Sequence, residues 1–288
     1  MNIGDRGATG AEHIDSKDQM TFIHTCTVRS GPMDGVHAVQ MFSARTFDKH
    51  WHDTFGFGLM DEGGQISASG RGQVQALAGQ IMTTNPGEVH DGVPMQQHAR
   101  RWRMVYVAPH VLADMVGQAN VEFTRPVLDD AMLHNVFDTL FCHWNPMTMA
   151  RENDMQEELL TRAIGMLVQR YSHQPLADER YTSFGAVREC LLDQLDSPPT
   201  LATLAELAGL SRYQLVRQFS RVHGLPPFAW LQQHRVRWAK TLIVKGMSLS
   251  EAALTSGFSD QSHLTRAFTR YLGFTPGTWQ RAQRPSAQ

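Results

Sequence analysis

Three histidines occupy two short segments that could hold a metal ion or a small polar molecule. His50 and His52 flank a tryptophan, and His90 ends residues 85–90, a segment that carries a Pro-Gly turn. Residues two apart in a strand point to the same side, so His50 and His52 are expected to share one face. Imidazole binds zinc, iron and copper and also hydrogen-bonds polar ligands. The histidines therefore predict a binding site, provided that the chain brings the two segments together.

The chain around these histidines, residues 20–108, has the pattern of a small antiparallel β-barrel or sandwich. It lacks long helical periodicity, is rich in Gly, Val and Phe, and is divided by glycine-bearing turns. Trp102, Met104 and Tyr106 fall at every second position, which is the spacing of one face of a strand. An inward-pointing face would place Trp102 and Tyr106 on the wall of the predicted pocket. A barrel core needs similar residues, so a structural role also stays open.

A second set of residues that could do chemistry forms an internal repeat near the end of the chain. Seven residues recur 49 positions later. In chain order they are Leu215, Arg217, Phe219, Arg221, Gly224, Pro227 and Trp230, followed by Leu264, Arg266, Phe268, Arg270, Gly273, Pro276 and Trp279. At about 100° per residue, the leucine and phenylalanine of each copy share one helix face and the arginines point the other way. One face is predicted to pack, while the other presents cations suited to bases and phosphates.

Each copy is predicted to be a helix, a short turn and a second helix, over residues 201–221 and 249–271. In the first copy Gly209 can adopt the left-handed conformation that ends a helix, and Ser211 is a good N-cap for the next helix. Asp260 is the corresponding N-cap in the second copy. An α-helix fits the major groove of DNA, so the two units predict two DNA-reading helices.

The segment that joins the two units, residues 228–245, contains no Gly or Pro and has apolar residues at helical spacing. A helix of that length is roughly 27 Å long, which is close to the ~34 Å of one DNA turn. Two reading helices held that far apart could enter successive major grooves, and one chain could then read a bipartite site.

The 288-residue chain has 42% hydrophobic and 19% charged residues, a composition that excludes a disordered or fibrous protein. Residues 1–180 hold 14 basic and 22 acidic residues, whereas residues 181–288 hold 12 basic and 6 acidic ones. The basic portion favours a polyanionic partner. No apolar stretch is long enough for a membrane span and the first residues lack the apolar core of a signal peptide, so a cytoplasmic location is expected. The cysteines lack the spacing of a disulfide framework or a thiolate zinc site.

The last hundred or so residues resemble the AraC/XylS family of transcription regulators. The sequences LATLAELAGLS in the first unit and SLSEAALTSGFSDQSHLTRAFTRYLGFTP in the second carry the resemblance, which covers about residues 184–282. The resemblance implies two helix-turn-helix units that bind double-stranded promoter DNA, usually to activate transcription by RNA polymerase. It also implies the base-contacting positions. These are Arg212, Tyr213, Val216 and Arg217 in the first unit, and Gln261, Ser262, His263, Thr265 and Arg266 in the second.

The barrel region resembles a cupin, the effector domain of many regulators in this family. Cupin metal sites usually include a glutamate a few residues after the second histidine, but here residues 53–56 read Asp-Thr-Phe-Gly. Three interpretations stay open: a metal site, a metal-free pocket that hydrogen-bonds an effector, and histidines with a structural role. The metal-free pocket is favoured, with no cofactor and no metal. The effector site is predicted at His50, His52, His90, Trp102 and Tyr106, and the three histidines are the candidate ligands for the metal alternative.

Residues 109–172 are predicted to be helical and to carry two apolar stripes. The stripes are Leu133, Val136, Phe137, Leu140 and Phe141, and then Leu160, Ala163, Ile164, Leu167 and Val168. Either both stripes pack against the barrel, or one of them pairs with its copy in a homodimer. The family resemblance favours a dimerisation region here. Residues 173–183 are predicted to be a linker and residues 1–19 a disordered N-terminus.

Together these patterns predict an α+β multidomain protein: an N-terminal cupin-like β-barrel with following helices, and a C-terminal all-α domain, residues 184–283, with two helix-turn-helix motifs. The predicted function is sequence-specific, DNA-binding transcription regulation, by an activator that is not an enzyme and is controlled by a small-molecule effector in the barrel. The alternative is a metal-dependent cupin enzyme with a helical appendage. That enzyme would need a metal with an open coordination position on His50, His52 and His90.

Overall fold

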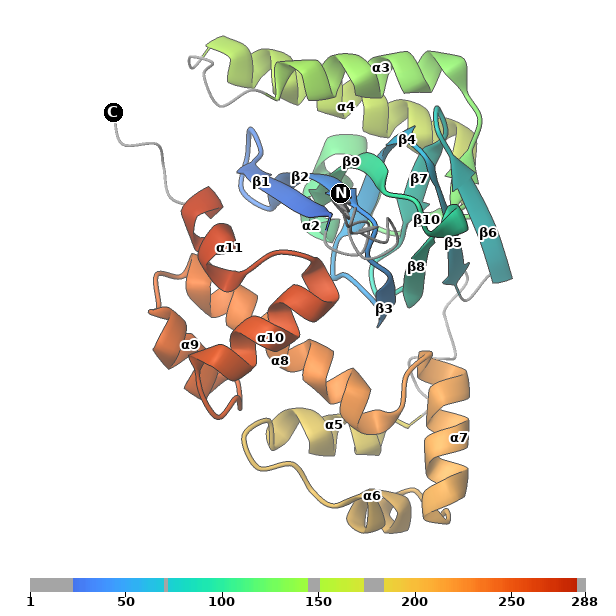
Figure 1. Cartoon of the computed structure of the whole chain (residues 1–288). Helices are drawn as coiled ribbons and strands as arrows, with labels where there is room; N and C mark the ends of the chain where they lie inside the picture. Colours follow the sequence, from blue (N-terminus) through green and yellow to red (C-terminus); the bar gives the residue numbers. More distant parts are fainter. Residues whose placement is uncertain (1–22, 70–71, 145–150, 174–183, 284–288) are drawn as a thin grey trace, which may run out of the picture.

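A computed structural model gives the architecture of the chain and describes residues 23–69, 72–144, 151–173 and 184–283. The predicted N-terminal segment 1–19 and residues 174–183 of the predicted linker lie outside the described residues. Across the described parts of the chain, no helix is long and apolar enough to cross a lipid bilayer. A β-rich N-terminal domain with helices on one side is followed by a helical C-terminal domain (Figure 1). The predicted α+β fold class is confirmed.

Two antiparallel sheets form the N-terminal barrel and lie on either side of a cavity that residues of both sheets line. The larger sheet has, in spatial order, β1 (His24–Ser30), β2 (Val36–Ser43), β9 (Arg100–Val107), β4 (Phe55–Glu62), β7 (Ile81–Thr84) and β11 (Val127–Leu128). The smaller sheet has β3 (Phe47–His50), β8 (His90–Pro94), β5 (Gly64–Ser69) and β6 (Gly72–Leu77). The remaining short elements are η1 (Met95–Gln97) and the strand pair β10 (Glu122–Phe123) and β12 (Ser172–His173).

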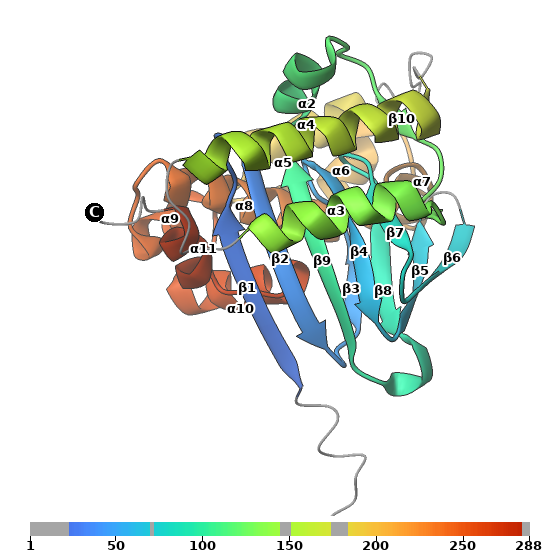
Figure 2. The same cartoon turned by 90° about the horizontal axis from the view of Figure 1, so that it is seen from above.

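Alternation along the strands gives the larger sheet two apolar faces. On β9, Val105 and Val107 belong to one buried cluster, whereas Trp102 and Met104 belong to another. The first face is covered by three helices, α2 (Pro109–Val116), α3 (Ala131–His143) and α4 (Arg151–Tyr171). Figure 2 shows α3 and α4 crossing this face, with the C-terminal domain beyond the sheet. The second face is the inner wall of the barrel.

Both apolar stripes predicted on residues 109–172 pack against the barrel. One buried cluster joins Leu133, Val136, Phe137 and Leu140 of α3, Leu160, Ala163, Ile164 and Leu167 of α4, and strand residues that include Phe57 and Val105. Burial of each large side chain stabilises the fold by about 1.5–3 kcal/mol. The interpretation in which one stripe is left free for a second copy is therefore wrong. The outer faces of α3 and α4 remain open, and Met132 and Met155 are exposed there.

The C-terminal domain is built from helices that match the predicted repeat. They are α5 (Gly185–Asp193), α6 (Leu201–Leu207), α7 (Arg212–His223), α8 (Pro227–Val244), α9 (Leu249–Thr255), α10 (Gln261–Leu272) and α11 (Pro276–Gln283). The pairs α6–α7 and α9–α10 are the two copies, and the 18-residue α8 joins them. At about 1.5 Å per residue, α8 is roughly 27 Å long.

The second helix of each unit, α7 or α10, is the predicted DNA-reading helix and is called a reading helix below. Local capping explains where these two helices start. Ser211 caps α7 by accepting a hydrogen bond from the backbone of Gln214, whose side chain binds back to Ser211. Asp260 caps α10 by accepting from the backbone N–H of His263. Gly209, in the turn before α7, has a positive φ of 65°, as the sequence predicted. A lost N-cap costs about 1 kcal/mol, so these residues help to fix the register of both helices.

The two helix-turn-helix units pack differently against the rest of the molecule. The first unit has a core of its own, centred on Leu215 and Phe219. The second unit has no separate core among the described residues, because Leu264 and Phe268 belong to the same buried cluster as Trp102 of the inner barrel wall. The barrel interior and the second unit are therefore one packing unit.

Candidate functional site

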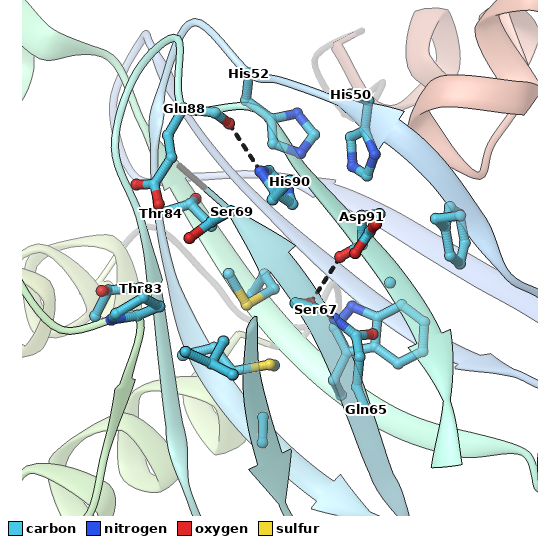
Figure 3. A pocket seen from close by; sticks show the side chains of 18 of the residues that line it. His50, His52, Gln65, Ser67, Ser69, Thr83, Thr84, Glu88, His90 and Asp91 are labelled. Atoms are coloured by element: carbon cyan, nitrogen blue, oxygen red, sulfur yellow. Dashed lines mark hydrogen bonds between the residues drawn. The ribbon is translucent and has the colours of Figure 1, made fainter. Parts of the chain in front are cut away.

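The barrel contains a cavity of about 850 Å³, counting its open mouth. This is a suitable size for a small organic ligand. Its lining mixes apolar side chains with histidine, serine, threonine and carboxylate groups. Figure 3 shows this lining, with the rings of His50, His52 and His90 grouped at one end. The described part of the chain thus offers both an apolar enclosure and polar groups that could orient a ligand.

All five residues predicted for the effector site lie on the wall of this cavity. His50 of β3 stands opposite His90 of β8 in the smaller sheet, and their ring centroids are 4.5 Å apart. His52 lies 5.0 Å from the ring of Tyr106, on β9 of the larger sheet. Trp102 lies two strand positions along from Met104, on the same inner face. The structure thus brings together two segments that are about 40 residues apart in the sequence.

Burial keeps the three imidazoles neutral. It lowers the pKa of His50 to about 3, and the nearby His90 adds to this effect. Burial likewise lowers the pKa of His52 well below its usual value, helped by the charges that His50 and His90 would carry. Burial is also the main cause that lowers the pKa of His90. Neutral imidazoles can accept a hydrogen bond or donate an electron pair to a metal.

Many lining residues were not predicted, and two groups among them bear on function. The first is the polar face of β5, where Gln65, Ser67 and Ser69 alternate with Ile66 and Ala68. This alternation is visible in the sequence and could have indicated a polar inner wall. The Ser67 hydroxyl donates a hydrogen bond of 2.7 Å to the backbone carbonyl of the neighbouring strand β8, which fixes this side of the cavity (Figure 3).

The second unpredicted group comes from the other domain. Tyr271 and Leu272, in the last turn of α10, complete the wall of the cavity. They are more than 160 residues from every predicted effector residue, and no local sequence pattern could have linked them to the barrel. The cavity is therefore closed by the end of the second reading helix.

The residues predicted to contact bases lie on the free faces of α7 and α10, and none of them is buried. Arg212, Tyr213, Arg217, Gln261, Ser262 and Arg266 are exposed, and Val216, His263 and Thr265 are half-buried. Tyr213 is 73% exposed, an unusual position for an aromatic side chain without a partner molecule. The two helices lie toward opposite ends of α8 (Figure 1). Both faces are thus available to a macromolecule.

The C-terminal end of α10 is held on the rim of the barrel by several contacts. Arg270 pairs with Asp48 of β3 at 2.8 Å. Arg45 donates hydrogen bonds to the last carbonyls of α10, at 3.2 and 3.4 Å. His24 donates a hydrogen bond of 2.6 Å to the carbonyl of Gly273, which leaves its other ring nitrogen to accept from a serine hydroxyl. The face of α10 that carries Arg270 was predicted to be free, but the last turn of α10 faces the barrel.

Both reading helices end in a glycine that touches the barrel. Gly273 follows α10 with φ of 79°, and a Cβ there would lie 2.7 Å from Met41 and 2.9 Å from Phe47. Gly224 follows α7 with φ of 73°, and a Cβ there would lie 2.8 Å from Val89. The two glycines hold equivalent places in the repeat, 49 residues apart. The barrel therefore contacts corresponding points of the two units.

The helix α8 is fastened to the segment that carries the first two histidines. The buried amide of Gln233 accepts a hydrogen bond from the backbone N–H of Trp51 and donates one to the carbonyl of Lys49, both at 3.0 Å. The ring of Trp51 packs against His234 of α8 at 4.8 Å. Arg237 pairs with Asp53 at 3.0 Å. The strand end that holds His50 and His52 thus cannot shift without disturbing α8.

These features are those of a protein that joins a ligand-binding barrel to a helix-turn-helix domain, and comparison with known proteins gives its family. An AraC-like ligand binding domain matches residues 34–164, and a helix-turn-helix domain matches residues 204–282. The chain belongs to the AraC family of transcription regulators. It is therefore a transcription regulator with an effector-binding domain and a helix-turn-helix DNA-binding domain.

Individual proteins and solved structures are similar to parts or most of this chain. The chain is 26% identical to the uncharacterized HTH-type transcriptional regulator YbfI of Bacillus subtilis over 223 residues, which is 76% of this chain and 81% of that protein. It is 26% identical over 140 residues to the HTH-type transcriptional activator RhaR of Klebsiella pneumoniae, covering 47% of this chain and 50% of RhaR. The crystal structure of ToxT from Vibrio cholerae matches 91% of this chain and 98% of ToxT, with a TM-score of 0.49 and 10% identity.

Acidification should weaken the joint between the barrel and α8 through His234. Burial and the charges of Arg237 and Arg188 lower its pKa to about 4, so in the folded protein it stays neutral at pH 5. The unfolded chain takes up a proton below about pH 6.5, so stability is full above that pH and is lost as the pH falls toward 4. At pH 5 the loss is about 1–2 kcal/mol.

This loss can be measured by urea unfolding at pH 7 and pH 5. We expect His234→Gln to lose about 1–2 kcal/mol less than the unsubstituted protein between the two pH values. The matched control is His98→Gln, because His98 is exposed on the barrel. A His234→Gln variant with the pH dependence of the unsubstituted chain would contradict the assignment.

Gly273→Ala should separate α10 from the barrel, whereas Gly209→Ala should not. Both substitutions place a side chain at positive φ, which costs roughly 1–2 kcal/mol. Only at Gly273 does the new methyl group collide with barrel side chains, because nothing lies within 4 Å of a Cβ at Gly209. Amide hydrogen exchange of β3 and of the last turn of α10 should rise in Gly273→Ala alone. Equal exchange in the two variants would mean that this contact does not hold the domains together.

Proposed function

We propose that this chain activates transcription at a bipartite promoter site, under the control of a small molecule held in the barrel cavity. The observation that carries the proposal is the position of Tyr271 and Leu272, which belong to a DNA-reading helix and line the cavity. A ligand in the cavity touches the end of α10 directly. We assign the cavity a regulatory and not a catalytic role for this reason.

The reading surface is proposed to consist of the exposed faces of α7 and α10. The contacting residues are Arg212, Tyr213, Val216, Arg217, Gln261, Ser262, His263, Thr265 and Arg266. Arginine can bond bidentately to guanine, and the hydroxyl and amide groups suit phosphates and base edges. The length of α8, close to one turn of DNA, supports contact with successive major grooves by the two helices.

Control of DNA binding requires that the effector bind more tightly to one arrangement of the domains than to another. The arrangement described here has α10 docked on the barrel rim through Asp48, Arg45 and Gly273. An effector that packs against Tyr271 and Leu272 adds contacts only in arrangements that keep this end of α10 at the cavity. Binding of the effector therefore increases the fraction of chains in which α10 is docked on the barrel. The position of α10 relative to α7 changes with that fraction.

Activation and self-association are proposed by analogy with relatives. RhaR is named as a transcriptional activator, which supports a contact between this chain and RNA polymerase at the promoter. A homodimer is proposed to form through the outer faces of α3 and α4, where Met132 and Met155 are exposed. Analytical ultracentrifugation of the full chain, with and without charged substitutions at these two methionines, tests the dimer.

Arg217→Ala and Arg266→Ala should each weaken specific DNA binding by about 1–3 kcal/mol. The reason is the loss of a guanidinium contact from an exposed helix face, which leaves the packing unchanged. The site is first found by genome-wide mapping of the sequences that the protein occupies, and affinity is then measured by fluorescence anisotropy. Binding should also fall steeply as salt is raised, because phosphate contacts release counterions.

The matched control for both variants is Arg101→Ala, which removes an arginine paired with Glu62 on the barrel. It should leave the affinity for DNA unchanged. Circular dichroism must show that the three variants are folded. An Arg217→Ala and an Arg266→Ala variant that both bind DNA like the control would place the reading surface elsewhere.

Tyr271→Ala should uncouple the effector from DNA. A thermal-shift screen of small metabolites identifies a ligand of the unsubstituted chain, and the change that it causes in DNA affinity is measured. In Tyr271→Ala the ligand should still bind, because the barrel supplies most of the wall, but its effect on DNA affinity should fall severalfold. Val74→Ala, which trims the wall on strand β6, is the control and should keep the response. Equal responses in the two variants would exclude α10 as the route of communication.

A further inference from the structure

The three cavity histidines form a cluster with the dimensions of a metal site. The ligand nitrogens of His50, His52 and His90 all lie within 4.8 Å of one another. The ring centroids are 4.5 to 5.3 Å apart, and the rings face a common space at one end of the cavity (Figure 3). His50 is only 7% exposed, so its ring is directed into the protein and not toward solvent.

Two backbone carbonyls fix the tautomer of two of these rings. Nδ1 of His50 lies 2.7 Å from the carbonyl oxygen of Asp48, and Nδ1 of His90 lies 2.9 Å from that of Glu88. A carbonyl can only accept a hydrogen bond, so in each ring Nδ1 carries the proton. Nε2 of each neutral ring therefore presents a lone pair. The same hydrogen bond from the second ring nitrogen supports most histidines that bind metals.

Among the described residues, no donor reaches the free nitrogens of these rings. The structure shows no hydrogen bond to Nε2 of His50 or His90 and none to either ring nitrogen of His52 within the parts of the chain that it describes. All three rings line the cavity, so a ligand in the cavity can reach these nitrogens. Several acceptors that face one another call for one shared electron-pair acceptor or hydrogen-bond donor between them.

We propose that His50, His52 and His90 bind one divalent transition-metal ion, with the remaining coordination positions open to the cavity. Neutral imidazole favours zinc, iron, cobalt, nickel or copper over magnesium and calcium, which prefer oxygen ligands. Burial lowers the pKa of each ring, so the ligands are neutral at physiological pH without competition from protons.

The nearest carboxylates are engaged elsewhere, which makes this a nitrogen site. Glu88 lines the cavity, but its carboxylate accepts hydrogen bonds from the backbone and the side chain of Asn85, at 3.2 and 2.8 Å. Asp91 accepts a hydrogen bond of 2.6 Å from the backbone of Ala68. The glutamate that is missing after His52 is therefore not replaced by another acid, and three protein ligands leave a position for a further donor.

The geometry needs only a small adjustment to close on an ion. Nitrogens around a tetrahedral ion with bonds of about 2.0–2.1 Å lie roughly 3.4 Å apart. The present separations reach 4.8 Å, so the rings must approach by about 1 Å, which small side-chain rotations provide. The remaining coordination positions would be open to the cavity, where an effector with an oxygen or nitrogen donor can bind the ion. In this respect the metal site rests on the proposed effector function and makes it more specific.

The metal site is also connected to the DNA-binding domain. Trp51 lies between two of the ligands, and the side chain of Gln233 on α8 holds its backbone N–H. Closure of the rings on an ion would pull on the segment from Lys49 to His52, which is the segment that α8 grips. Metal loading therefore reaches the helix that connects the two reading units.

Metal retention by the full chain tests the site. Protein purified without a histidine tag is stripped with a chelator, incubated with Zn²⁺ or Co²⁺ and dialysed, and the bound metal is measured by mass spectrometry. We expect about one ion per chain, and for Co²⁺ a visible absorption band that azide shifts by taking the open position. His90→Gln should weaken retention more than about tenfold.

The matched control is His37→Gln. His37 is 6% exposed in the same barrel and stacks on Tyr106 at 5.1 Å, but it is not part of the cluster, so its substitution should leave retention unchanged. His52→Gln is the second ligand variant, used if His90→Gln does not fold as judged by circular dichroism. Failure of the unsubstituted chain to retain metal, or equal retention in the ligand and control variants, overturns the site. DNA affinity of the metal-free chain is measured in parallel, so loss of the metal proposal is distinguishable from loss of the regulatory one.

Discussion

The docking of the second reading helix on the barrel is the contact on which the rest of the structure depends. Leu264 and Phe268 of this unit share a buried cluster with the inner wall of the barrel. Apolar burial of this kind is worth about 25 cal/mol per Å² and outweighs the ion pairs at the same joint. The pair Arg270–Asp48 is about half exposed on both sides, so it orients the helix more than it holds it. The cavity wall, the barrel rim and the end of α10 are therefore packed together, and a change in the docking of α10 alters all three.

The internal repeat has a second consequence besides the duplicated reading surface. A helix that ends in a left-handed glycine presents bare backbone to its neighbour, because no Cβ shields it. The barrel uses this bare surface twice, at Gly224 through Val89 and at Gly273 through Phe47. Val89 is adjacent in the chain to His90, and Phe47 lines the cavity itself. Each helix-turn-helix unit thus contacts the barrel at a residue that lines the cavity or is next in the chain to one that does.

Much of this arrangement could be predicted from the sequence, because its signals are local. Alternation placed Trp102 and Tyr106 on one strand face, and the spacing of the repeat gave the capped helices α7 and α10. Helical periodicity shows that a face is apolar without showing which partner covers it. From the sequence alone, the stripes of α3 and α4 can cover either the barrel or a second copy, and the structure places both on the barrel. The pairing of Arg270 with a residue 222 positions away leaves no local pattern at all.

The three histidines show where composition and geometry give different answers. A missing glutamate argued for a metal-free pocket, since the usual ligand set was incomplete. The fold adds information that the motif lacks: backbone carbonyls fix the tautomers of His50 and His90, and one ring nitrogen of each of the three histidines lies within 4.8 Å of the others. Complete reversal of a two-state equilibrium, from about 1:99 to 99:1, needs roughly 5.5 kcal/mol of differential binding, which is a large demand on one small ligand in a mixed apolar and polar cavity. The proposed ion would add strong, directional bonds to the segment that Gln233 of α8 holds by hydrogen bonds. His50 and His52 thus belong both to the proposed metal site and to the segment that is hydrogen-bonded to α8.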